Sequence, residues 1–226
     1  MTPNKEDYLK CIYELGQLDQ KITNKLIAEK MAFSAPAVSA MLKKMLAENL
    51  IYKDAKTGYL LSQTALKMVA NLYRKHRLVE VFLVKQLGYS SEEVHEEAEI
   101  LEHTVSDRFI NRLDLLLEQP QTCPHGGTIP QEGQPLIERY QKRLSQLVEA
   151  GNYQLVRIHD FYQLLQYLES HDLRVGDQLT VAGFDQFAQT ITIQYKNKEL
   201  AVPIAIAQQL FVEKTNDSHP ANENHP

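Results

Sequence analysis

Apolar side chains recur at helical spacing through the first part of the chain. A helix is predicted over residues 3–18, with an apolar stripe formed by Leu9, Ile12, Tyr13 and Leu15. Further helices are predicted over 22–31 and 35–46, where Ser34 is a natural N-cap and Pro36 suits a first turn. Two short helices joined by a tight turn match a helix-turn-helix, whose second helix lies in the DNA major groove. An ordinary helical hairpin fits this stretch as well.

Two short β-type segments follow within residues 50–61, around a lysine-rich turn that contains Gly58. This pattern predicts a hairpin, and a hairpin directly after a recognition helix is the wing of a winged helix. The candidate DNA-binding residues are therefore Ser34, Pro36, Ala37, Ser39, Lys43, Lys44, Lys53, Lys56 and Tyr59. The lysines and Tyr59 are expected near phosphates, where contacts supply affinity without sequence information.

A long helix is predicted over residues 63–87, followed by a break at Gly88. His76 and Glu80 stand four residues apart and share a face of this helix, a spacing more typical of a surface salt bridge than of metal ligands. After Asp107 the chain carries more apolar residues than one helical stripe needs. The excess predicts a partner surface, most simply that of a symmetric dimer.

Between these helical segments lies a stretch with two imidazoles and two carboxylates on one helical face: His95, Glu99, Glu102 and His103. Like charges on one face cost stability unless a positive group lies beside them, and a divalent cation would serve. The neighbouring glutamates of this charge-rich run favour a different interpretation, a solvated acidic face. The stretch alone leaves both interpretations open.

Residues 119–135 form a loop rich in proline and glycine, in which Cys123 and His125 flank Pro124. A thiol and an imidazole held close together suit a metal ion. A structural cysteine and a nucleophile–base pair are the alternatives, but no oxyanion or orienting motif supports the second. We therefore favour a metal.

The remaining chain changes character. A connecting helix is predicted over 136–150, closed by Gly151. Short strand-like segments then alternate with turns through residues 151–214, interrupted by a helix over 161–170, and so many strands in so little chain predict a small β-barrel. Residues 215–226 are polar and are expected to be disordered.

Composition adds an uneven charge. Residues 1–90 hold 14 Lys and Arg against 8 Asp and Glu, whereas the remainder holds 10 against 21, within a net charge of -5. A basic front and an acidic back indicate different partners for the two halves. Two cysteines make no disulfide framework, and neither a signal peptide nor a membrane-spanning run is evident, so we expect a cytoplasmic protein.

Four segments in this order carry a family resemblance: MTPNKEDYLKCIYEL at the start, HRLVEVFL at 76–83, HEEAEILEHTVSD at 95–107 and CPHGGTIP at 123–130. Together with the winged helix and the barrel, they resemble the diphtheria toxin repressor family of metalloregulators, in its manganese-responsive branch with a C-terminal SH3-like domain.

The resemblance implies a mainly α chain with a β C-terminal domain. The expected parts are a winged-helix DNA-binding domain at 1–72, a helical metal-binding and dimerisation domain at 73–135, the connecting helix at 136–150, an SH3-like, FeoA-type domain at 151–214, and a disordered tail at 215–226.

The resemblance also implies two metal sites per subunit. By position, one resembles Asp7, Glu99, Glu102 and His103, and the other Glu80, Cys123, His125 and Asp160, with His76 and His95 nearby. Hard oxygen donors and imidazole suit Mn(II) or Fe(II), while Cys123 admits Zn(II) or Cd(II) in vitro. Two positions depart from relatives: Lys10 replaces a second carboxylate found in some of them, and Ala40 replaces a longer polar residue.

The implied function is that of a Mn(II)-dependent repressor rather than an enzyme. The homodimer would bind double-stranded operator DNA and control metal-uptake genes, with no membrane partner. Two alternatives stay open here. One is a metal-independent winged-helix regulator whose barrel binds a ligand or protein. The other is a metallohydrolase, although H-E-x-x-H is absent from the chain.

Overall fold

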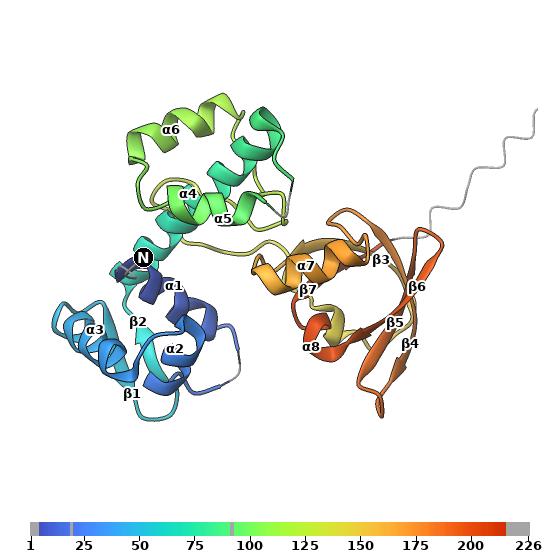
Figure 1. Ribbon diagram of the computed structural model, residues 1–226, viewed down its shortest axis with the longest axis horizontal. Coiled ribbons are helices and arrows are strands. Elements are labelled where there is room, and N and C mark those ends of the chain that lie inside the picture. The colour runs from blue at the N-terminus through green and yellow to red at the C-terminus, as the bar shows by residue number, and fades with distance from the viewer. Residues whose placement is uncertain (1–4, 19, 91–92, 216–226) are drawn as a thin grey trace, which may run out of the picture.

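The computed structural model describes residues 5–18, 20–90 and 93–215, which form three lobes (Figure 1). A helical lobe with a small hairpin lies at lower left, a second helical lobe lies above it, and a β-sheet lobe lies to the right. The predicted fold class, mainly α with a β C-terminal domain, is confirmed. Within the described ranges, no helix is both long and apolar enough to cross a membrane.

Helix α4 (Gln63–Leu87) belongs to both helical lobes. Its 25 residues extend about 37 Å at 1.5 Å per residue. Ser62 caps its first turn by accepting from the Ala65 N–H, and Gly88 ends it in the left-handed conformation. The N-terminal half buries Ala65, Val69 and Tyr73 in the lower core, and the C-terminal half buries Leu78, Val81 and Leu83 in the upper core. A rigid helix therefore connects the two lobes.

The lower lobe, here called the winged-helix lobe, has the predicted helix-turn-helix and hairpin. Its elements before α4 are α1 (Lys5–Leu15), α2 (Asn24–Met31), α3 (Ala35–Ala47), β1 (Ile51–Asp54) and β2 (Gly58–Leu61). The hairpin is held to the segment before α2, because Tyr59 N donates to Ile22 O at 3.1 Å. Gly58 adopts φ +89°, and a Cβ there would lie 2.0 Å from the Ile22 carbonyl oxygen, so the contact requires glycine.

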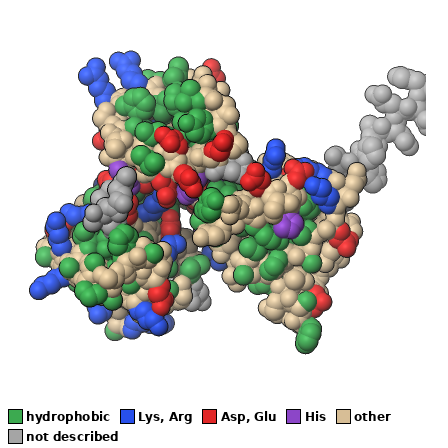
Figure 2. Space-filling view, viewed as in Figure 1, with side chains coloured by type: hydrophobic (Ala, Val, Ile, Leu, Met, Phe, Trp, Pro, Cys, Tyr) green, Lys and Arg blue, Asp and Glu red, His purple; other side chains and the backbone are tan. Residues whose placement is uncertain are grey.

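The upper lobe, here called the helical lobe, combines the second half of α4 with α5 (Val94–Leu101), α6 (Asp107–Leu116) and the loop that follows. Ser106 caps α6 by accepting from the Phe109 N–H. Three large apolar side chains of α6 stay exposed: Phe109, Leu115 and Leu116. Hydrophobic side chains gather on this upper lobe in Figure 2. The excess of apolar residues seen in the sequence therefore lies at the surface.

The β lobe is a five-stranded antiparallel sheet in the order β6-β5-β4-β3-β7. The strands are β3 (Gly151–Ile158), β4 (Gln178–Asp185), β5 (Thr190–Tyr195), β6 (Lys198–Pro203) and β7 (Leu210–Lys214). Helices α7 (Tyr162–Ser170) and α8 (Ile204–Ala207) pack on a core that includes Leu155, Leu164, Leu179 and Ile193. Thr215 N donates to Asn152 O at 3.0 Å. The rest of the predicted tail, 216–226, lies outside the described residues.

The connecting helix predicted over 136–150 is wrong. This segment is extended apart from one 3-10 turn, η1 (Leu144–Gln146). Its side chains enter different lobes: Leu136 packs against the winged-helix core, and Leu144 is fully buried in the β-lobe core. Its backbone also pairs with the sheet, since Val212 N donates to Lys142 O. Tertiary contacts in several directions override the local helical pattern, because one helix cannot serve them all.

Candidate metal centre at the junction of the lobes

Three groups of potential metal-ligating side chains occur among the described residues, where the lobes meet, and two of them share Glu80. Acidic and histidine side chains gather at this junction in Figure 2. The donor atoms of each group lie within 4.8 Å of one another. The groups are His76, Glu80, His95 and Asp160; then Glu80, Cys123 and His125; and then Asp7, Glu102 and His103.

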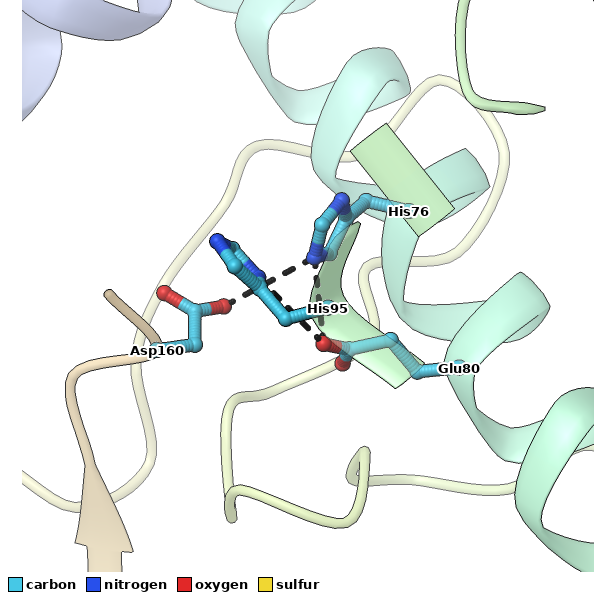
Figure 3. A group of neighbouring side chains, drawn as sticks. All are labelled: His76, Glu80, His95 and Asp160. Carbon is cyan, nitrogen blue, oxygen red and sulfur yellow. Dashed lines mark hydrogen bonds and ion pairs between the residues drawn. The ribbon is translucent and has the colours of Figure 1, made fainter. Parts of the chain in front are cut away.

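The first group draws on three elements (Figure 3). His76 and Glu80 come from α4, His95 from α5, and Asp160 from the segment between β3 and α7. His76 Nε2 lies 3.1 Å from Glu80 Oε1 and 3.9 Å from Asp160 Oδ2. Both His76 and Glu80 are completely buried, so the pair is not the surface salt bridge of which such spacing is typical. Other elements cover this face of α4, which a local pattern does not reveal.

The second group shares Glu80 with the first and adds the loop ligands. His125 Nδ1 lies 3.1 Å from Glu80 Oε1, and Cys123 is buried beside them. A turn fixes the loop, because Gly126 N donates to Cys123 O and Cys123 N donates to Gly127 O. The sequence-based set placed Asp160 with this group. In the structure Asp160 groups with Glu80, which the Cys123 group shares, and with the two histidines.

The third group joins the winged-helix lobe to the helical lobe. Asp7 lies on α1, whereas Glu102 and His103 follow the last residue of α5. His103 Nε2 lies 2.8 Å from Asp7 Oδ1 and 3.3 Å from Glu102 Oε1. His103 Nδ1 lies 2.9 Å from Glu6 Oε2, a contact that the sequence-based set missed. Glu6 precedes Asp7 on α1, and no motif singled it out.

Glu99 lies outside this group. Its side chain is 52% exposed, and its Oε1 atom lies 3.6 Å from Lys10 Nζ and 3.5 Å from His95 Nε2. Lys10 also lies 3.4 Å from Glu102 Oε1 and is itself largely buried. Burial opposes its charge, but Glu102, Glu14 and Glu99 outweigh burial and raise the pKa of Lys10. An ammonium group therefore already neutralises part of the carboxylate cluster.

The buried donors hold protons in this arrangement. Burial lowers the pKa of His76, whereas the Glu80 carboxylate raises it, and the net result is a pKa raised to about 9. His125, beside the same carboxylate, has a pKa well above its ordinary value despite burial. Burial, and then the charge of Glu80, raises the pKa of the Cys123 thiol to about 11. Burial opposes ionisation of Glu80 itself, but the two imidazolium ions hold its pKa well below the usual range.

The donor set fits a divalent cation. Glu80 Oε2 and His95 Nδ1 are buried without a hydrogen-bond partner among the described residues. Buried polar atoms in native structures normally have partners, and these two atoms belong to one donor group, so a bound cation there would satisfy both. Carboxylate, imidazole and one thiol are the ligand types that first-row divalent metals accept.

The candidate DNA-binding residues lie on α3 and the hairpin. Ser34 is the residue before α3, and the side chains of Pro36, Ala37, Lys43 and Lys44 are exposed. Ser39 is also exposed, but its Oγ donates to Ala35 O and accepts from Asn24 Nδ2. On the hairpin, Lys53 and Lys56 are exposed.

Tyr59 is the exception. Its side chain is buried in the winged-helix core, and Lys53 Nζ lies over its ring at 5.5 Å from the centroid. The expected contact between Tyr59 and the DNA backbone is therefore wrong. Lys53, opposite Tyr59 in the hairpin register, lies over its ring and stays exposed.

Comparisons with known proteins agree with this architecture. Three family models match in succession: "Iron dependent repressor, N-terminal DNA binding domain" at 1–58, "Iron dependent repressor, metal binding and dimerisation domain" at 63–131, and "FeoA domain" at 142–214. The solved structure of the manganese regulator SloR is 55% identical with a TM-score of 0.88, covering 95% of this chain and 100% of that one. The chain belongs to the diphtheria toxin repressor family.

Members of this family are metal-dependent transcriptional repressors, not enzymes. The diphtheria toxin repressor of Corynebacterium diphtheriae is 25% identical over 95% of this chain and 98% of its own length. ScaR with bound Zn2+ is 54% identical with a TM-score of 0.90, over 94% of this chain and 100% of that one. The chain thus combines a DNA-binding domain, a dimerisation domain and a C-terminal FeoA, or SH3-like, domain.

Replacing Lys10 by methionine tests how far its ammonium competes with a bound cation. We expect Cd(II) to bind Lys10→Met at least tenfold more tightly at the Asp7, Glu102 and His103 group. At an effective dielectric of about 20, unit charges about 4 Å apart interact by about 4 kcal/mol, so removing the ammonium is a large effect. Chelator-competition titrations measure the affinity. The matched control is Lys30→Met. It removes the ion pair between Lys30 of α2 and Glu14 of α1. Equal affinities in both variants would contradict the expectation.

Proposed function

We propose that this chain is a cytoplasmic, Mn(II)-responsive repressor that binds operator DNA as a homodimer and controls metal-uptake genes. The solved structures similar to it include SloR, a manganese regulator, and ScaR, a manganese-activated repressor. The donors of the Asp7, Glu102 and His103 group are oxygen and imidazole, which suit Mn(II). A structure of ScaR with bound Cd2+ accords with the thiol donor at Cys123, so we expect Zn(II) and Cd(II) to bind in vitro and Fe(II) to be tolerated.

The observation that carries this proposal is the position of Asp7. It lies on the first helix of the DNA-binding domain, and its carboxylate oxygen is 2.8 Å from His103 Nε2 in the dimerisation domain. We expect Asp7, Glu102 and His103 to share one cation, which supplies the positive charge that fixes α1 against the end of α5. The position of the recognition helix in each subunit then depends on these three side chains.

The required energy is within reach of such a site. Moving a two-state equilibrium from 1:99 to 99:1 takes about 5.5 kcal/mol of differential binding. Asp7 contributes only when the two lobes are together, so its bond to the cation is absent from any state in which they separate. That bond and the relief of repulsion between Asp7 and Glu102 make the cation bind more tightly to the joined state than to the separated one.

The two alternative functions find less support. A hydrolase would need an open position with a general base, and the family consists of repressors. A metal-independent regulator would not need the orphaned donors Glu80 Oε2 and His95 Nδ1 in its interior.

A mobility-shift experiment tests the proposal with the His103→Ala variant. The probe is DNA recovered by in vitro selection with the wild type in Mn(II). We expect wild-type binding in Mn(II), release by chelator, and about a hundredfold weaker binding by His103→Ala, at the upper end of usual coupling energies. Dimerisation, measured by sedimentation, should persist. His171→Ala, which removes a histidine of the β lobe, should bind as the wild type does. Mn(II)-independent binding by the wild type would refute the proposal.

The pH dependence of Cd(II) affinity tests the second group. Cys123 and His125 hold protons near neutral pH because their pKa values are raised. Metal binding must release both protons, so affinity increases as pH rises through neutrality, at most by about a hundredfold per pH unit. The thiolate-to-cadmium charge-transfer band reports the binding. In His125→Gln only one proton remains to be released, and the slope should fall to about tenfold. A pH-independent affinity would contradict this account.

A further inference from the structure

Two buried arginines and one half-buried carboxylate lie beside the Cys123 loop, outside the donor groups. Arg77 comes from α4, Glu138 from the extended segment after the loop, and Arg157 from β3. Arg77 Nη2 donates to Glu138 Oε1 at 2.6 Å, and Arg157 Nη1 lies 3.4 Å from the same oxygen. One carboxylate thus joins the helical lobe to the β lobe.

The network holds the ligand loop by its backbone. Thr128, three residues after His125, uses both of its backbone polar groups here. Its N–H donates to Glu138 Oε2 at 2.9 Å, and its carbonyl oxygen accepts from Arg77 Nη1. A Cβ at Gly127 would lie 2.6 Å from Arg77 Cζ, so the guanidinium packs directly on the loop backbone. Movement of Arg77 or Glu138 would therefore move the loop that carries Cys123 and His125.

The same network reaches the β lobe and Asp160. The Arg157 guanidinium lies 3.5 Å from the centroid of the Phe211 ring, which fixes it against β7. The loop is joined to β3 at the residue after Arg157, because Ile158 N donates to His125 O at 2.9 Å. Asp160 follows two residues later. The loop ligands and Asp160 are thus positioned by one set of contacts on β3.

Buried ion pairs stabilise proteins weakly, since desolvation offsets their attraction. Arg77 and Glu138 each also direct one polar atom to the Thr128 backbone, which ties the ion pair to the loop. Burial opposes ionisation of Glu138, but Arg77 and Arg157 outweigh it and hold its pKa below the usual range, so the carboxylate is charged.

We propose that Arg77, Glu138 and Arg157 are positioning residues that hold the Cys123 and His125 loop, with the β lobe, against Glu80. Metal affinity at this group then depends on docking of the β lobe onto α4. The inference rests on the proposed function, because it concerns the affinity of a site that the proposed function fills.

Cadmium titration of the Glu138→Gln variant of the full-length chain tests the inference. The charge-transfer band between thiolate and cadmium reports only the Cys123 group, because the Asp7, Glu102 and His103 group has no sulfur. We expect Glu138→Gln to bind Cd(II) at least tenfold more weakly by this band. Glu149→Gln is the matched control, since Glu149 is an exposed carboxylate paired with Lys214. Its affinity should equal that of the wild type.

The outcomes separate the two proposals. A wild type without the band would overturn the proposed thiolate site itself. A wild type with the band and a folded Glu138→Gln variant within threefold of its affinity would overturn the positioning role alone. If Glu138→Gln does not fold, as judged by circular dichroism, Arg157→Gln decides by the same criterion, because it removes only the β-lobe side of the network.

Discussion

The burial of carboxylates where three lobes meet is the constraint on which the rest of the structure depends. Glu80 is completely buried and Glu102 is 2% exposed. An isolated buried carboxylate is costly, so each needs a cation or hydrogen-bond donors. His76 serves both, with Nδ1 2.6 Å from Glu102 Oε2 and Nε2 3.1 Å from Glu80 Oε1. The two candidate metal-binding regions are therefore in direct contact through one imidazole, and a change at either alters the partners of the other.

This constraint explains why the lobes are joined as they are. Helix α4 carries His76 and Glu80 at the middle of its length, where its winged-helix half ends and its helical-lobe half begins. The winged-helix lobe contributes Asp7 and Lys10, and the β lobe contributes Asp160. Each lobe thus supplies charge to one shared interior. Regulation by a metal follows naturally, because a dication binds most tightly where several carboxylates already lie together and lack sufficient positive charge.

The sequence predicted the parts that depend on local patterns. The long helix predicted over 63–87, with its break at Gly88, has the bounds of α4. Helical spacing and the Cys123 loop named some members of the candidate metal site, and the family resemblance added Asp7, Glu80 and Asp160. The failures share one cause, which is contact between distant segments. Lys10 of α1 pairs with Glu99, and the helix predicted over 136–150 yields to side chains that enter separate lobes. Tyr59 is buried for the same reason, because the winged-helix core packs on its side chain.

The central claim is that one cation joins the DNA-binding domain to the dimerisation domain through Asp7. Anomalous diffraction at the manganese absorption edge, from crystals of the Mn(II)-loaded protein, tests it most directly. The account predicts a peak in contact with Asp7, Glu102 and His103 in each subunit. Manganese peaks confined to other positions, with Asp7 bound to no metal, would contradict it.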